Sequence, residues 1–337
     1  MRLKALLVIL LTALAACSGS QPQAPASGRT VIRFATDWRA EAEHGGFYEA
    51  LAMGEYARRG LDVRIIPGGP TVNVPQLVGS GAVEMGDGSN SFIVLNLARE
   101  NAGVRAVAAF MQKDPQVLMA HPDAGINSLA DMRGHPILIS DASRTAWWPW
   151  LKAKYGFADS QVRSYTFNNA PFMNDRHVVQ EGYLTSEPYT IEHDRQGGFK
   201  PRVFLLADEG YPGYAAMVLA SQHMIDQNPA AIRAFVEASA IGWRNYLHGD
   251  PKPADQLILR DNPEMTEDIL AQARDKMRSY GIVDGGDVST VGYGAMTDAR
   301  WAAFFQAVSK QDPVNYPASL NYRAAYTTSF LPNPPVK

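Results

Sequence analysis

Cysteine is almost missing from this sequence, since one residue, Cys17, stands among 337. A single thiol excludes a disulfide within the chain and a zinc site built from cysteines. An excess of one charge is missing too, because 31 basic residues face 34 acidic ones, a net charge of -3. That balance offers no basic surface to nucleic acid, so we expect no nucleic-acid partner. Beyond the N-terminal segment no run of 18 apolar residues occurs, so we expect no membrane-spanning helix there.

Motifs for common enzyme chemistries are missing as well. No Gly-x-Gly-x-x-Gly or Gly-x-x-x-x-Gly-Lys-Ser/Thr loop and no Gly-x-Ser-x-Gly elbow is present. The seven histidines form no His-x-x-x-His or His-Glu-x-x-His pattern. Glu41, Glu43 and His44 are adjacent, but acidic residues at such a place commonly serve the positive end of the following helix. We therefore expect no catalytic residue, no metal ion and no cofactor.

The N-terminus has the pattern of an export signal. Arg2 and Lys4 precede an apolar run over 5–16, which is too short to span a bilayer but has the length of a signal-peptide core. The run ends in Leu-Ala-Ala-Cys, which resembles the lipobox of bacterial lipoproteins and predicts that Cys17 carries a lipid. An ordinary secretory signal followed by a coincidental cysteine is the alternative.

The segment after Cys17 supports an anchored protein. Residues 17–29 are rich in Ser, Pro, Gln and Gly, a composition typical of a flexible tether. We predict a signal peptide over 1–16, a tether over 17–29, and export across the inner membrane. The lipid on Cys17 would then hold the protein in the cell envelope, facing the periplasm or the exterior.

From residue 30 onward short apolar runs alternate with helical patterns. We predict strands at 31–35, 61–66, 82–85, 104–110, 117–120, 136–140, 161–167, 183–186, 203–206 and 214–220. We predict helices at 46–58, 74–80, 92–100, 126–132, 145–155, 229–246, 267–280 and 298–308. Repeated β-α-β units predict an α/β fold with mostly parallel sheets flanked by helices.

The length of the chain and its 46% hydrophobic content favour two lobes. We expect the second lobe to be inserted into the first, with 117–121 and 214–221 as the crossing segments and a ligand cleft between the lobes. The predicted division is lobe I over 30–116 and 214–311, lobe II over 117–213, and a C-terminal extension over 312–337.

Candidate ligand contacts in the first lobe lie where predicted strands meet helices. Trp38 follows the first strand, and His44 precedes Gly45, one of two adjacent glycines that would let a ligand approach the backbone. Asp87, Ser89 and Asn90 follow the third strand. They are interpreted either as a loop that contacts the ligand or as the cap of the next helix.

Candidate contacts in the second lobe are of two kinds. Ser143 and Arg144 precede a predicted helix, where they would supply a polar grip. Glu187 and Tyr189 combine an acidic group with an aromatic ring. In such a pair the acidic group accepts a hydrogen bond from an amino group on the ring of a planar ligand, and the ligand stacks on the aromatic ring. A surface salt bridge is the alternative for Glu187.

Several segments together resemble the NMT1/THI5-like family of type II periplasmic binding proteins. The resembling stretches are 34–38 (FATDW), 44–48 (HGGFY), 54–63, 67–70 (PGGP), 78–86 (VGSGAVEMG), 112–115 (QKDP), 182–189 and 262–266 (NPEMT). The resemblance implies a Venus-flytrap fold that closes on a small molecule and delivers it to the permease and ATPase subunits of an ABC importer. It also implies cleft contacts at Trp38, His44, the 87–90 segment, Glu187 and Tyr189.

The ligand that the resemblance implies is a thiamine-precursor pyrimidine of the formylaminopyrimidine or hydroxymethylpyrimidine type. A receptor for a sulfonate, nitrate or similar anion, with Arg144 as the counter-charge, is one alternative, and a receptor for a flavin-like ring is another. Fungal members of the family are pyrimidine synthases with a cysteine-rich iron-binding motif. This sequence lacks that motif, so a synthase-type enzyme is disfavoured.

Overall fold

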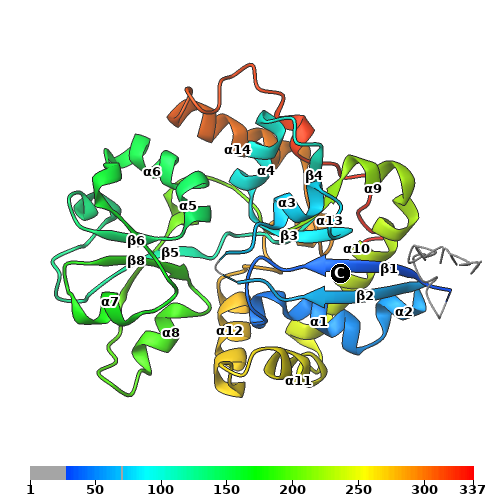
Figure 1. Cartoon of the computed structure of the whole chain (residues 1–337), viewed down its shortest axis with the longest axis horizontal. Helices are drawn as coiled ribbons and strands as arrows, with labels where there is room; N and C mark the ends of the chain where they lie inside the picture. The colour runs from blue at the N-terminus through cyan, green and yellow to red at the C-terminus, as the bar shows by residue number, and fades with distance from the viewer. Residues whose placement is uncertain (1–27, 70) are drawn as a thin grey trace, which may run out of the picture.

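The computed structural model describes residues 28–69 and 71–337. Two five-stranded sheets lie side by side within them, each flanked by helices (Figure 1). This arrangement confirms the expected two-lobed α/β architecture. The predicted signal peptide, Cys17 and most of the predicted tether lie outside the described residues. No helix in the described part of the chain is both long enough and apolar enough to cross a bilayer.

The first sheet combines strands that are distant in sequence. Its order is β2 (Leu61–Ile66), β1 (Thr30–Ala35), β3 (Met85–Asn90), β10 (Ala215–Ser221) and β4 (Val104–Met111). β1 runs parallel to β2 and to β3, whereas β10 runs antiparallel to β3 and β4. Because Ala35 pairs with Gly86, the residues that follow β1 lie beside the second half of β3.

The second sheet uses only the middle of the chain. Its order is β7 (Val162–Ser164), β6 (Ile137–Ile139), β8 (Val179–Tyr183), β5 (Gln116–Ala120) and β9 (Arg202–Leu205). β6 is parallel to β7 and β8, and β5 is antiparallel to β8 and β9. Its strands are shorter than those of the first sheet, and β5, β6 and the start of β8 are buried.

Each sheet is mixed, with two parallel and two antiparallel pairings, instead of mostly parallel as expected. The antiparallel pairings all involve β5 and β10, the first strands after the chain passes from one sheet to the other. β5 follows β4 of the first sheet, and β10 follows β9 of the second. The segments expected to cross, 117–121 and 214–221, largely coincide with these two strands. The connections between the sheets are therefore the preceding segments, 112–115 and 206–214.

The helices surround the sheets in two groups (Figure 1). Around the first sheet lie α1 (Gly45–Ala52), α2 (Glu55–Arg58), α3 (Val74–Gly79), α4 (Ser91–Arg99), α9 (Gln222–Gln227), α10 (Pro229–His248), α11 (Lys252–Asp261), α12 (Glu267–Ser279), α13 (Val288–Val291) and α14 (Asp298–Gln311). Around the second lie α5 (Asp141–Thr145), α6 (Trp148–Tyr155), α7 (Ala170–Asn174) and α8 (Glu187–Glu192).

Several predicted elements differ from the observed ones, and the helix expected over 126–132 is only a 3-10 turn over Leu129–Met132. The helix expected over 46–58 is two helices, because Gly54 adopts a left-handed φ of 73° that ends α1. The helix expected over 145–155 is divided between α5 and α6. The strand expected over 183–186 is wrong, since β8 ends at Tyr183 and α8 begins at Glu187 with Pro188 in its first turn.

The long helix α10 fixes α1, which follows the end of β1, against the first lobe. Gly45 and Gly46 of α1 lie against the rings of Tyr246 and Trp243, so close that a Cβ on Gly45 would lie 2.0 Å from Tyr246 Cε1. Phe47 packs edge-on against Trp243, with ring centroids 5.9 Å apart. This close packing holds the segment between β1 and α1 in place, and that segment carries part of the site described next.

The C-terminal extension covers the free edge of β4. Thr327 N–H donates a hydrogen bond to the carbonyl of Ala106, and Tyr326 forms a parallel bridge with the same residue. The 3-10 turn Tyr322–Ala325 packs on α4 and α14. The segment thereby pairs an edge strand that would otherwise be open to another chain.

Candidate ligand-binding cavity

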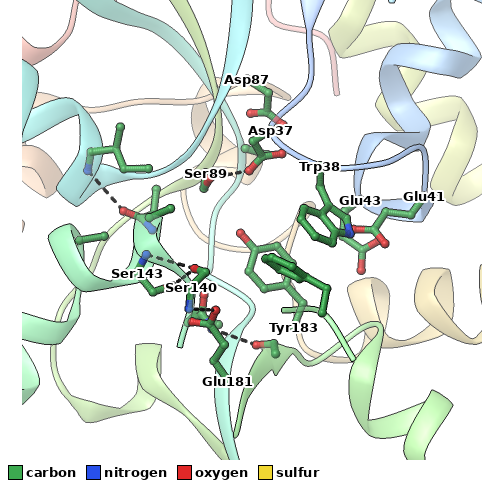
Figure 2. A pocket seen from close by; sticks show the side chains of 18 of the residues that line it. Asp37, Trp38, Glu41, Glu43, Asp87, Ser89, Ser140, Ser143, Glu181 and Tyr183 are labelled. Atoms are coloured by element: carbon green, nitrogen blue, oxygen red, sulfur yellow. Dashed lines mark hydrogen bonds between the residues drawn. The ribbon is translucent and has the colours of Figure 1, made fainter. Parts of the chain in front are cut away.

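A cavity of about 130 Å³ lies between the two sheets. Its wall is formed by both lobes: the residues after β1, the second half of β3, the start of α5, the segment after β7, and β8 (Figure 2). The lining residues are Asp37, Trp38, Glu41, Glu43, His44, Gly69, Val72, Asp87, Ser89, Asn90, Ile93, Met111, Gln116, Ser140, Ala142, Ser143, Ala146, Tyr165, Phe167, Glu181, Gly182, Tyr183, Glu187 and Ala216.

A polar cluster from β3 and the segment after β1 forms one side of the cavity. His44 is 2% exposed, and its Nε2 lies 3.1 Å from Asp37 Oδ1 and 3.8 Å from Asp87 Oδ2. Ser89 Oγ donates a hydrogen bond to the other oxygen of Asp37. Residues 86–90, expected as a loop, belong to strand β3, so alternation along the strand brings Asp87 and Ser89 to the same face.

Asp87 is a buried carboxyl group with an unused acceptor. Its Oδ1 has no hydrogen-bond partner, and only 3% of the side chain is exposed. Burial, and then the charge of Asp37, raises the pKa of Asp87 well above its usual value.

Asn90 caps helix α4. Its side-chain oxygen accepts hydrogen bonds from the backbone N–H groups of Phe92 and Ile93, at 3.1 and 3.4 Å. The capping interpretation therefore describes this residue, although it also lines the cavity.

Glu41 and Glu43 line the cavity, whereas the sequence pattern assigned them to a helix end. Glu41 makes no side-chain cap to the short turn that follows it, and it is 7% exposed. Burial, followed by the charges of Glu43 and Glu187, raises its pKa well above the usual value. Glu43 accepts a hydrogen bond from Thr185 of the second lobe, and burial raises its pKa too.

An aromatic pair connects the lobes across the cavity. The rings of Trp38 and Phe167 lie with centroids 3.9 Å apart and planes tilted by 39°. On the side of the second lobe, the ring centroids of Tyr165 and Phe167 lie 4.7 Å apart. Phe167 has a φ of 62°, a left-handed conformation that is strained for a bulky side chain. Strain of this kind persists where the surrounding structure imposes it, often at binding sites.

The second lobe contributes a carboxyl group held by a serine. Ser140 N–H donates to Glu181 Oε1 at 2.6 Å, and Ser140 Oγ donates to Ser143 Oγ at 3.0 Å. Glu181 Oε2 has no partner. Burial raises the pKa of Glu181 to about 7. Ser143, a predicted contact, thus lies on the wall beside this group.

Glu187 also lies on the wall of the second lobe. Its Oε2 accepts the N–H of Tyr183 at 2.7 Å, and its Oε1 accepts the hydroxyl of Tyr165 at 3.4 Å. Burial raises its pKa to about 7. Because its oxygens accept hydrogen bonds from groups of its own lobe, the surface salt bridge considered for Glu187 is not the contact that it makes.

Three predicted contacts lie outside the cavity wall. Gly45 faces the ring of Tyr246, so it provides close helix packing and no approach for a ligand. Arg144, at the end of α5, is 42% exposed and lies 3.7 Å from Asp141 on the same helix. Tyr189 stacks on His193, one turn along α8, with ring centroids 3.9 Å apart. Sequence position near a junction does not determine which face of a short helix points inward.

Residues that sequence reasoning missed include Glu41, Glu43, Phe167, Glu181 and Tyr183. Glu181 and Tyr183 alternate along β8, which was predicted too late in the chain. Phe167 is the last residue of the strand predicted over 161–167, but β7 ends at Ser164, so Phe167 lies in the irregular segment that follows. β8 reads Val-Gln-Glu-Gly-Tyr, with a single aliphatic residue, so no apolar pattern marked the strand that carries Glu181.

The charge of the wall is one-sided. Six carboxyl groups and one imidazole line the cavity, and no lysine or arginine does so in the described ranges 28–69 and 71–337. A wall of this kind offers no lysine or arginine to pair with an anion, and it accepts hydrogen bonds from a donor-rich or positively charged group. The rings of Trp38, Tyr165, Phe167 and Tyr183 add flat apolar surface.

One group of side chains has the composition of a metal site. Single ligand atoms of Asp37, His44 and Asp87 all lie within 4.8 Å of one another. Carboxylate oxygens and an imidazole nitrogen suit zinc or another divalent transition metal. However, His44 Nδ1 has no hydrogen-bond partner, whereas the second nitrogen of a metal-binding histidine is normally held by one.

Comparison with known proteins shows to which family the chain is similar. The family described as NMT1/THI5 like matches residues 41–254. The riboflavin-binding protein RibY of Chloroflexus aurantiacus is 24% identical, and the alignment covers 98% of each chain. A formylaminopyrimidine-binding protein of Halalkalibacterium halodurans is 23% identical over 72% of this chain and 74% of its own length.

The fold is also found in solved structures. The periplasmic aliphatic sulphonate binding protein SsuA from Escherichia coli superposes with a TM-score of 0.60 over 87% of this chain and 96% of that chain. Its sequence identity is 14%. The likeness is therefore one of fold.

Proposed function

The chain belongs to the NMT1/THI5-like family, and from this membership we propose that it is the extracytoplasmic solute-binding subunit of an ABC importer. It captures a small molecule between its lobes and passes it to a permease powered by an ATPase. The predicted lipid on Cys17 would keep the protein in the cell envelope beside that permease.

The composition of the cavity wall carries the proposal for the ligand. Carboxyl groups accept hydrogen bonds from amino substituents, while Trp38 and Phe167 offer faces to a planar ring. A thiamine-precursor pyrimidine, of the formylaminopyrimidine or hydroxymethylpyrimidine type, has a flat ring with an amino substituent. The similarity to the formylaminopyrimidine-binding protein agrees with this choice.

Riboflavin is the second candidate, because the similarity to RibY extends over nearly the whole of both chains. Its ring system would stack on the same aromatic faces, and its ribityl hydroxyl groups would donate hydrogen bonds to carboxylates. Sulfonate and nitrate fit the wall poorly, since an anion would lie among six carboxyl groups. Arg144, considered as the counter-charge, lies away from the wall.

Closure follows from the way in which both lobes contribute to the wall. A solute ring that contacts Trp38 of the first lobe and Phe167 of the second would touch both lobes, so its binding energy favours an arrangement that keeps both lobes against the solute. Thr185 and Glu43 form a further contact between the lobes, and both are buried. The two connections, 112–115 and 206–214, are the segments about which the lobes would move.

We assign no chemical reaction to the cavity. A pyrimidine synthase that uses a lysine-bound pyridoxal phosphate would need a lysine in the wall, and none lines it within the described residues. Lys113 lies in the connection 112–115 between the sheets, and its Nζ pairs with Asp208 Oδ1 at 2.7 Å.

A thermal-shift screen tests the proposal. The purified protein is heated with formylaminopyrimidine, hydroxymethylpyrimidine, riboflavin, methanesulfonate or nitrate, and the same screen is run on Trp38→Ala. We expect a shift with a heteroaromatic compound that is lost in the variant. Stabilisation by methanesulfonate or nitrate alone would contradict the proposed ligand class.

A further inference from the structure

We propose that the cavity binds its solute as an organic cation. This inference rests on the proposed function and narrows its ligand class, because an aminomethylpyrimidine carries an ammonium group whereas the formylaminopyrimidine and hydroxymethylpyrimidine types do not. The acceptors of the wall, the lack of lysine and arginine among the described residues that line it, and its aromatic faces carry the argument.

Unused acceptors are present on both lobes. Asp87 Oδ1 and Glu181 Oε2 have no hydrogen-bond partner, and both residues are more than nine-tenths buried. Glu41 is equally buried and reaches the cavity from the segment after β1. Asp87 lies on β3, Glu181 on β8 and Glu41 in the segment after β1, so the three carboxyl groups reach the cavity from different sides.

Buried carboxylates without counter-charges are unstable. A carboxylate removed from water needs a cation, hydrogen-bond donors or a proton, and the wall supplies no lysine or arginine among the described residues. The pKa values of Glu41, Asp87 and Glu181 are accordingly raised by burial. The empty cavity therefore holds protons that a cation entering it would replace.

The aromatic faces favour an organic cation. A positive group over the face of a tryptophan or tyrosine is attracted by the ring, and more strongly when it is desolvated. Trp38 and Tyr183 both line the cavity together with the carboxyl groups. Figure 2 shows Trp38 beside Glu41 and Glu43, and Tyr183 between the groups of the two lobes.

A metal ion fits these observations less well. Within the described residues, the one such group is Asp37, His44 and Asp87, whose ligand atoms lie within 4.8 Å of one another, and it leaves Glu41 and Glu181 without a counter-charge. His44 Nδ1 also lacks the partner that would orient a metal-bound imidazole.

The charge of the solute determines how many protons the cavity releases when the solute binds. A solute that enters with its own positive charge turns carboxylic acids into carboxylates, and each such group releases its proton to the solvent. A neutral solute leaves these protons in place. The two cases differ in the number of protons released and in the change of affinity with pH.

Calorimetry with two matched pyrimidines tests the inference. The probes are 4-amino-5-aminomethyl-2-methylpyrimidine, which carries an ammonium group at pH 7, and its N-formyl derivative, which does not. We expect the amine to bind at least about tenfold more tightly, which corresponds to 1.4 kcal/mol. Titrations in buffers of different ionisation enthalpy should show protons released by the amine and none by the formamide.

Two carboxyl variants and one control locate the effect. Glu41→Gln and Glu181→Gln should each reduce the preference for the amine at least threefold. Asp123→Asn, which removes an exposed carboxylate outside the cavity wall, should not change it. Two cavity variants keep the test valid if one of them does not fold.

The outcomes separate the two proposals. Equal or tighter binding of the formamide overturns the cation inference and leaves the proposed function in place. Binding of neither pyrimidine and of no other heteroaromatic compound overturns both. If EDTA treatment abolishes the preference for the amine and one equivalent of zinc chloride restores it, the amine binds a metal ion in the cavity and the inference is wrong.

Discussion

Trp38 of the first lobe and Phe167 of the second are in contact across the cavity, with ring centroids 3.9 Å apart and ring planes tilted by 39°. The first ring follows β1 and the second follows β7, so the two belong to different sheets. A planar solute that separates the rings would stack on both. The affinity for such a solute and the closure of the lobes would then depend on the same two side chains.

Substitutions of Phe167 should weaken ligand binding, and a substitution by glycine should also relieve backbone strain. Phe167→Ala and Phe167→Gly both remove the ring, and we expect each to weaken binding of a heteroaromatic solute about tenfold, the scale of one stacking contact. Because φ is 62° at this position, glycine should be more stable than alanine by about 1 kcal/mol. Chemical denaturation and calorimetry measure the two effects. An alanine variant as stable as the glycine variant would show that the backbone is not strained there.

Glu181 should make the empty protein less stable as the pH rises. Its carboxyl group has a pKa of about 7 when folded and about 4.5 when unfolded, so the folded state holds the proton more tightly between these values. Raising the pH from 5 to 8 should therefore lower the free energy of unfolding by up to about 3 kcal/mol through this group.

Glu181→Gln cannot ionise and should lose that part of the pH dependence. Asp123→Asn removes a carboxylate from an exposed position and serves as the control. Denaturation at pH 5 and pH 8 decides the matter. The same pH dependence in Glu181→Gln and in the unmodified protein would contradict the role of burial.

Gly45 should matter for stability and not for ligand contact. A Cβ at this position would lie 2.0 Å from the buried ring of Tyr246, and an overpacked site of this kind costs about 1–3 kcal/mol. Gly45→Ala should lower the melting temperature, while the folded fraction keeps its affinity for the solute. An unchanged melting temperature with a large loss of affinity would restore the direct ligand contact expected from the sequence.

Arg144 should be dispensable for binding. Its side chain is exposed and faces Asp141 on its own helix, so Arg144→Ala should change the affinity for a heteroaromatic solute less than twofold. Equilibrium dialysis with a labelled solute measures this. A loss of nearly all affinity would support the anion receptor in which Arg144 supplies the counter-charge.

The first lobe of the site could be predicted in part because β1 is a regular apolar strand. The apolar pattern predicts that this strand ends at Ala35, as it does, and so predicts Trp38 and His44 as cleft contacts after it. Glu41 and Glu43 were misinterpreted, since an acidic pair before a helix has the same sequence pattern whether it caps the helix or lines a cavity. Only the packing of α1 against α10 decides between the two.

The second lobe was less predictable because its elements are short. β6 and β7 have three residues each, and α5 has five, so periodicity could not define the face that points inward. Arg144 and Tyr189 were placed in the cleft for this reason, and Glu181 was missed. The antiparallel pairings of β5 and β10 follow from the crossing between sheets, a long-range property that no local pattern records.

Calorimetric titration of one preparation of the purified protein, with formylaminopyrimidine and its parent amine and then with methanesulfonate, tests the central claim most directly. The acidic and aromatic wall predicts that at least one of the two pyrimidines binds with one equivalent and at least about 100-fold more tightly than the sulfonate, a difference of about 2.7 kcal/mol. Methanesulfonate binding as tightly as either pyrimidine, or more tightly, would contradict the account.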